Sequence, residues 1–132
     1  NYKEIKALVN SMAVFPKILS RVASTPYGKH NYIMEDVAWW THWGAIAIPS
    51  RLYWAYFLIK ELKILWDNGY IYKDFKANNL LFDDGKKLKL LGPDHIDVVP
   101  VNSKFKDIYE WSWILENESG VLYNLYEPPE TP

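Results

Sequence analysis

The sequence predicts a mixed α+β fold, because segments with helical periodicity alternate with short strand-like segments. Residues 2–12 and 50–67 repeat apolar residues with the period of a helix, and residues 79–91 place two apolar runs around a central Asp-Asp-Gly turn. The length of 132 residues suits one domain, and an apolar content of 49% suits a chain with its own core.

The first half of the chain predicts a helix followed by two strands. Residues 2–12 form one apolar helical face, made by Ile5, Leu8, Val9 and Met12. Residues 17–23 alternate apolar and polar side chains, which is typical of a half-buried strand, and residues 31–37 suit a second strand. Between them, residues 25–28 (Thr-Pro-Tyr-Gly) indicate a turn.

The clearest helix is expected over residues 50–67. Pro49 and Ser50 mark its start, with the Ser50 hydroxyl available to cap the first free amides, and Asn68-Gly69 supplies a left-handed stop. The expected buried stripe consists of Leu52, Ala55, Leu58, Ile59, Leu62 and Leu65.

The second half predicts a hairpin and a last helix. Residues 79–82 and 86–91 flank the turn at residues 83–85, and Gly92-Pro93 ends the second strand. A helix is expected over residues 104–117, while the proline-rich tail, residues 127–132, cannot be helical.

Composition excludes several functional classes. The chain has no cysteine, which excludes a disulfide scaffold, a thiolate zinc site and a cysteine nucleophile. A net charge of −1 gives no reason to expect nucleic acid as a partner. The most apolar region, residues 37–59, is interrupted by His42, Pro49 and Arg51, so membrane contact is not expected either. The lack of cysteine and of a signal-peptide pattern slightly favours a cytoplasmic location without fixing the compartment.

Aromatic residues make up 17% of the chain, and many gather in the middle of the sequence. We expect most of this cluster to be core, with some of its tryptophans exposed toward a partner; a membrane-surface or sugar-binding role is the alternative. The cluster consists of Trp39, Trp40, Trp43, Tyr53, Trp54 and Tyr56.

The segment that carries chemistry lies between the long helix and the hairpin. Asp74, Lys76 and Asn79 place a carboxylate, an ammonium and an amide on one short loop. Because a tight hairpin returns the chain to its start, Asp94 is expected near Asn79, and such oxygens are ligands suited to Mg²⁺. Lys76 supplies a cation for a phosphate, and Asp74 could accept a hydroxyl proton.

This loop resembles the catalytic loop of the protein kinase superfamily, whose pattern is H-R-D-x-x-x-x-N, then a hairpin, then D-F-G. Residues 72–79 (YKDFKANN) match its spacing. The resemblance implies Asp74 as the catalytic aspartate that orients and deprotonates the acceptor hydroxyl, Lys76 as the lysine that steadies the phosphoryl group, and Asn79 with Asp94 as metal ligands. It also implies ATP and Mg²⁺ as cofactors and a hydroxyl acceptor, either on a protein or on a small molecule.

The resemblance extends in order over about 110 positions. Residues 2–12 are similar to helix C, residues 14–37 to the strands before the hinge, and residues 50–67 to helix E. Residues 107–115 are similar to the start of helix F, where Asp107 would brace the loop. The implied domain covers residues 1–126, with a partial small lobe (1–37) and a partial, mainly helical large lobe (38–126).

Because the sequence departs from the family pattern, both an active kinase and an inactive relative remain as interpretations. Tyr72 and Lys73 replace the His and Arg of the motif, and Gly92 stands thirteen residues after Asn79, where the acid of D-F-G is expected. Either a hairpin two residues longer lets Asp94 take that role, with Asp97 a weaker choice, or the metal-binding acid is lost. The short stretch from Asp94 to Asp107 leaves no room for an activation loop and resembles atypical small kinases.

The glycine-rich strands and the ATP-anchoring lysine of the family have no counterpart in this sequence. Glu4 could be the helix C acid that pairs such a lysine, although a solvated helix charge is the favoured interpretation. We therefore expect this chain alone to be inactive and a partner or further chain region to cover both ends. The alternatives are a fragment of an active kinase, a chain completed by a partner, a pseudokinase that serves as a binding or structural module, and an unrelated α+β domain lacking the hairpin.

Overall fold

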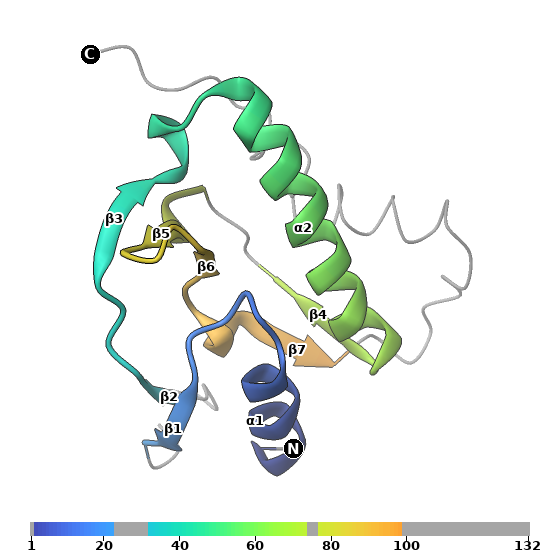
Figure 1. Ribbon diagram of the computed structural model, residues 1–132. Coiled ribbons are helices and arrows are strands. Elements are labelled where there is room, and N and C mark those ends of the chain that lie inside the picture. The colour runs from blue at the N-terminus through green and yellow to red at the C-terminus, as the bar shows by residue number, and fades with distance from the viewer. Residues whose placement is uncertain (1, 23–31, 74–76, 99–132) are drawn as a thin grey trace.

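The fold is mixed α+β in the computed structural model, which describes residues 2–22, 32–73 and 77–98 (Figure 1). Two α-helices and three small antiparallel sheets lie within these ranges, so the expected fold class is confirmed at this level. The helices are α1 (Tyr2–Ser11) and α2 (Ile48–Asp67). The sheets pair β1 (Ile18–Arg21) with β2 (Tyr32–Met34), β5 (Leu80–Asp83) with β3 (Trp39–His42) and β6 (Leu88–Leu90), and β4 (Tyr70–Tyr72) with β7 (Ile96–Val98).

Helix α2 begins two residues before the expected start, and the predicted Ser50 cap is wrong. The N-cap is Ala47, whose side chain makes no capping bond, and Pro49 lies in the first turn, where a missing N–H costs nothing. Arg51 reaches back instead, donating to the carbonyl oxygens of Ile46 at 3.0 Å and Gly44 at 2.9 Å. The C-terminal stop is as expected, with Gly69 at a φ of 88°.

The buried face of α2 is shifted from the expected stripe. Leu52 is 53% exposed and was wrongly placed, while Arg51 is buried. The helical period explains the difference, because counting back seven residues from Leu58 reaches position 51 and not 52. The remaining expected residues follow the stripe, with Ile59 only partly buried and Ala55, Leu58, Leu62 and Leu65 buried.

The aromatic cluster divides between the core and the surface. Trp43 is buried and stacks on Phe82 with ring centroids 6.4 Å apart, and the partly buried Trp54 meets the same ring edge-on at 5.4 Å. Tyr53 and Tyr56 are 67% and 65% exposed, so the expectation of core positions is wrong for them. The side chains of Trp39 and Trp40 lie outside the described part. None of the described helices is both long and apolar enough to cross a membrane.

The predicted hairpin is confirmed as β5 and β6, which pair in register from Leu80 with Leu90 to Phe82 with Leu88. Strands β1 and β2 fall within the two expected segments but are shorter. Strands β3, β4 and β7 were not predicted, because three- or four-residue strands carry little periodic signal. The turn at 25–28, the helix at 104–117 and the tail at 127–132 lie outside the described residues.

One short backbone segment joins α1, α2 and the hairpin. The carboxylate of Glu61, buried on α2, accepts the N–H groups of Ala13 at 2.7 Å and Val14 at 2.9 Å. The carbonyl of Val14 accepts the N–H of Leu90 at 2.7 Å, and the carbonyl of Ala13 accepts Lys89 Nζ at 2.9 Å. The connection between α1 and β1 is thereby fixed to both large elements.

Replacing Glu61 tests the strength of this junction. We expect Glu61→Leu to lower the free energy of unfolding by about 2–5 kcal/mol, because two backbone amides lose their acceptor in the interior. The matched control is Glu35→Leu, which removes a carboxylate from the exposed N–H of Lys17 and is expected to cost less than about 1 kcal/mol. Urea unfolding of both variants measures the difference, and equal losses would contradict this role for Glu61.

Candidate functional site

The start of the candidate loop is held by the pairing of β4 with β7. Tyr72 lies opposite Ile96, and the N–H of the next residue, Lys73, donates to the carbonyl of His95 at 2.9 Å. The backbone directly before Asp74 is therefore bonded to the residue directly after Asp94. Asp74, Lys76 and Asp107 themselves lie outside the described residues.

The hairpin closes at Asn79. Its carbonyl oxygen accepts the N–H of Leu91 at 2.8 Å, one step beyond the last paired residues of β5 and β6. The chain thus returns to Asn79 at Leu91, three residues before Asp94. The pairing of β5 and β6 ends there, so Asp94 lies beyond the hairpin, on the short turn that follows it.

Tyr72 joins the start of the loop to the end of the hairpin. Its buried ring lies 5.9 Å from the ring of His95, edge to face, and its hydroxyl donates to the carbonyl of Leu91 at 2.8 Å. In the sequence, Tyr72 stands out only as a departure from the family's histidine. The bond gives this residue a positioning role, because it fixes the backbone immediately before Gly92.

Gly92 occupies a position that cannot hold a larger residue without strain. Its φ is 90°, in the left-handed region, and a Cβ atom there would lie 2.9 Å from His95 Cδ2 and 3.2 Å from Tyr72 Oη. The same Cβ would lie 3.4 Å from Asp94 Oδ1. The acid that the family places at this position has no room, and the short 3₁₀ turn Pro93–His95 brings the Asp94 carboxylate to the side of Gly92 instead.

The negative charge of Asp94 acts on Tyr32 of the small β1–β2 sheet. Burial raises the pKa of Tyr32 on β2, and the negative charge of Asp94 raises it further, while Arg21 opposes the change. Asp97, the weaker candidate, is exposed and lies 3.7 Å from Lys73 Nζ through its Oδ2 oxygen.

The described part of the chain holds no group of three or more His, Asp or Glu residues able to bind a metal ion. A cation at Asn79 and Asp94 would therefore have one protein carboxylate and one amide from these ranges. This donor set fits Mg²⁺, which keeps several waters and takes further oxygens from substrate phosphates.

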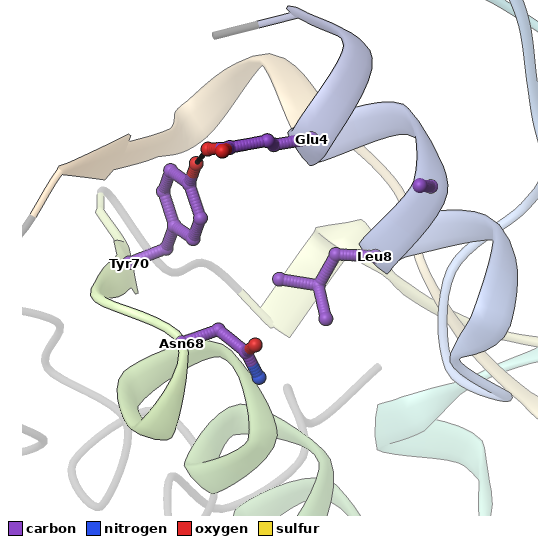
Figure 2. Close-up of a pocket in the computed structure, with 5 residues that line it drawn as sticks. Glu4, Leu8, Asn68 and Tyr70 are labelled. Atoms are coloured by element: carbon purple, nitrogen blue, oxygen red, sulfur yellow. Dashed lines mark hydrogen bonds between the residues drawn. The ribbon is translucent and has the colours of Figure 1, made fainter.

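Glu4 has a partner that the sequence did not indicate. The hydroxyl of Tyr70 on β4 donates to Glu4 Oε2 on α1 at 2.9 Å (Figure 2). This hydrogen bond raises the pKa of Tyr70, and burial and the Glu4 charge add to the effect. The pair borders an open pocket of about 490 Å³ that is also lined by Ala7, Leu8 and Asn68.

The crowding around Gly92 can be separated from its backbone strain. Gly69 has a nearly equal φ of 88° but open space around its Cβ position, so Gly69→Ala is expected to cost about 1–2 kcal/mol from strain alone. Gly92→Ala should cost about 1–3 kcal/mol more, because Tyr72 and His95 must move. Urea unfolding measures the free energy of unfolding of both variants. Equal losses would mean that Tyr72 and His95 move aside without cost.

The Glu4–Tyr70 bond makes a prediction at alkaline pH. The pKa of Tyr70 is raised in the folded state above its ordinary value of about 10. The stability that the Tyr70–Glu4 bond gives the folded protein is therefore complete below about pH 10. It is lost as the pH rises through the folded-state pKa. Wild-type protein should therefore lose more stability from about pH 9 to 11 than Tyr70→Phe. Urea midpoints across this range measure the difference, since all other tyrosines are common to both proteins; parallel curves would contradict the assignment.

Comparison with known proteins gave no relative. A scan against protein-family models found no match, and a search of the curated proteins found none either. The resemblance to the kinase family therefore stays a prediction from the sequence motif at residues 72–79.

Proposed function

We propose that the chain is the loop-bearing part of a divergent kinase-like protein that holds Mg²⁺-ATP and directs its terminal phosphoryl group to a hydroxyl acceptor. The observation that carries the proposal is the closed arrangement around Leu91, whose N–H and carbonyl bind Asn79 and Tyr72. The ends of the motif segment and the turn that bears Asp94 are thereby brought to one place. An unrelated fold that merely imitates the motif was expected to lack this hairpin.

The metal-binding part of the proposal rests on Asn79 and Asp94. Asn79 is partly buried and fixed through its own carbonyl, whereas Asp94 is exposed on the 3₁₀ turn, with its carboxylate beside Gly92. One fixed ligand and one exposed ligand suit a cation that arrives with ATP and retains waters. When bound, the cation would neutralise charge on the phosphate oxygens.

The remaining roles come from the motif. Asp74 would orient the acceptor hydroxyl and take its proton, and Lys76 would steady the phosphoryl group in transfer. Asp107 would brace the loop. Such chemistry depends mainly on positioning and on fixed charge, so the anchoring at Lys73 and Leu91 supports it by setting both ends of the region.

A second function is favoured by one specific observation. At position 92 the family's acid is replaced by a glycine, where a side chain would be strained and would force His95 to shift. A chain that no longer binds the metal would act as a catalytically inactive module that presents its surface to a larger assembly. The exposed Tyr53 and Tyr56 on α2 are consistent with such a surface.

Mg²⁺-ATP binding separates the two functions. We expect millimolar Mg²⁺-ATP to raise the melting temperature of the protein, because a ligand that binds only the folded state stabilises it by mass action. Asp94→Asn should remove the shift, because Asp94 is the one carboxylate among the described residues that the proposal assigns to the metal ion. Asp97→Asn, which removes an exposed carboxylate three residues away, should keep it.

The outcomes are distinct. No stabilisation of wild-type protein would reject nucleotide binding by this chain and favour the inactive module. A shift that survives Asp94→Asn but not Asp97→Asn would assign the metal to Asp97. ATP without Mg²⁺ serves as the ligand control, and a shift of equal size would contradict a metal-bridged site.

A further inference from the structure

The pocket between α1 and the end of α2 lies outside the proposed metal site. Glu4, Ala7 and Leu8 of α1 form one wall, and Asn68 and Tyr70 form the other (Figure 2). Its volume of about 490 Å³ is sufficient for one long side chain, and it is open to solvent.

The polar groups of this pocket are hydrogen-bond acceptors. Glu4 accepts the hydroxyl of Tyr70 at Oε2, and its exposed carboxylate has lone pairs for further donors. Asn68 uses its Nδ2 to donate to the carbonyl of Ile64 at 2.8 Å, which leaves its Oδ1 oxygen as an acceptor. A ligand that brings donors can therefore bind both Glu4 and Asn68, and the Glu4 charge favours a cation.

The end of α2 adds to this preference. Asn68 is the C-cap of the 20-residue α2, and the C-terminal end of a helix carries a partial negative charge. A cation in the pocket would lie between this end and the Glu4 carboxylate.

We propose that the pocket binds an arginine side chain of a partner peptide. Figure 2 shows Glu4 and Asn68 at opposite ends of the pocket, with Leu8 between them on one side and Tyr70 on the other. A guanidinium carries donors on several edges and can bond to two separated acceptors, which a single ammonium does less well. Leu8 and Ala7 offer apolar surface for the methylene stem of the arginine.

The test uses a small peptide mimic. N-acetyl-arginine methylamide is titrated into the ¹⁵N-labelled protein, and the shifts of the Asn68 side-chain amide and the Leu8 backbone amide report binding. The citrulline analogue, which has nearly the same shape but no charge, should bind at least tenfold more weakly. Equal shifts from the two analogues would overturn the proposal, and tighter binding of the lysine analogue would overturn the choice of arginine.

Variants locate the site. Glu4→Gln should weaken binding at least tenfold, and Asp36→Asn, which removes the charge of another exposed acid, should leave it unchanged. Tyr70→Phe keeps the ring but frees Glu4 from its internal bond, so it should bind arginine at least as tightly as wild type. Loss of binding in Tyr70→Phe, or equal weakening by Glu4→Gln and Asp36→Asn, would contradict the proposal. Mg²⁺-ATP stabilisation should not change in any of these variants, so failure here is distinguishable from failure of the proposed function.

Discussion

The two-residue segment Ala13–Val14 is the constraint on which the described fold depends. Both of its N–H groups bind the Glu61 carboxylate, and both of its carbonyls bind consecutive residues of β6, through Lys89 Nζ and Leu90 N–H. The backbone groups of the buried Val14 need partners, and both α2 and β6 supply them; Ala13 adds one part-buried and one exposed bond to the same elements. The position of α1 relative to the hairpin is therefore set by one buried acid and one strand end, with apolar packing around them.

The candidate site follows from the same anchoring. Leu90 is fixed to Val14, and the next residue, Leu91, binds Asn79 through its N–H and Tyr72 through its carbonyl. Because the N–H groups of both Leu90 and Leu91 and the carbonyl of Leu91 are hydrogen-bonded, the chain has little freedom when it reaches Gly92. A left-handed glycine then turns it into the 3₁₀ segment that carries Asp94. The place of the carboxylate is thus a consequence of how the hairpin ends.

The sequence predicted those features that depend on local pattern. The periodicity of α1 and α2, the stop at Gly69 and the hairpin turn all follow from neighbouring residues. Features that depend on distant partners were missed. Arg51 is buried because its guanidinium donates to the carbonyls of Gly44 and Ile46 in the preceding turn. Strand β4 forms because β7 pairs with it. The candidate site divides in the same way, because spacing predicts Asn79 and Asp94 as ligands but not the bonds that join Leu91 to Asn79 and Tyr72.

The spacing of the family motif places an acid at position 92, and the backbone there explains why this chain has a glycine instead. Thirteen residues after Asn79 the backbone has a φ of 90° and Tyr72 and His95 fill the space beside it, so an aspartate there would be strained and crowded. A carboxylate two residues later avoids the strain, and its Oδ1 lies within van der Waals distance of where that side chain would begin. It comes from an exposed turn, however, and so is held less rigidly than a group on a strand. If the proposed function holds, metal binding at such a residue would depend more on the phosphate that accompanies the cation than on the protein, and nucleotide and metal binding would then depend on each other.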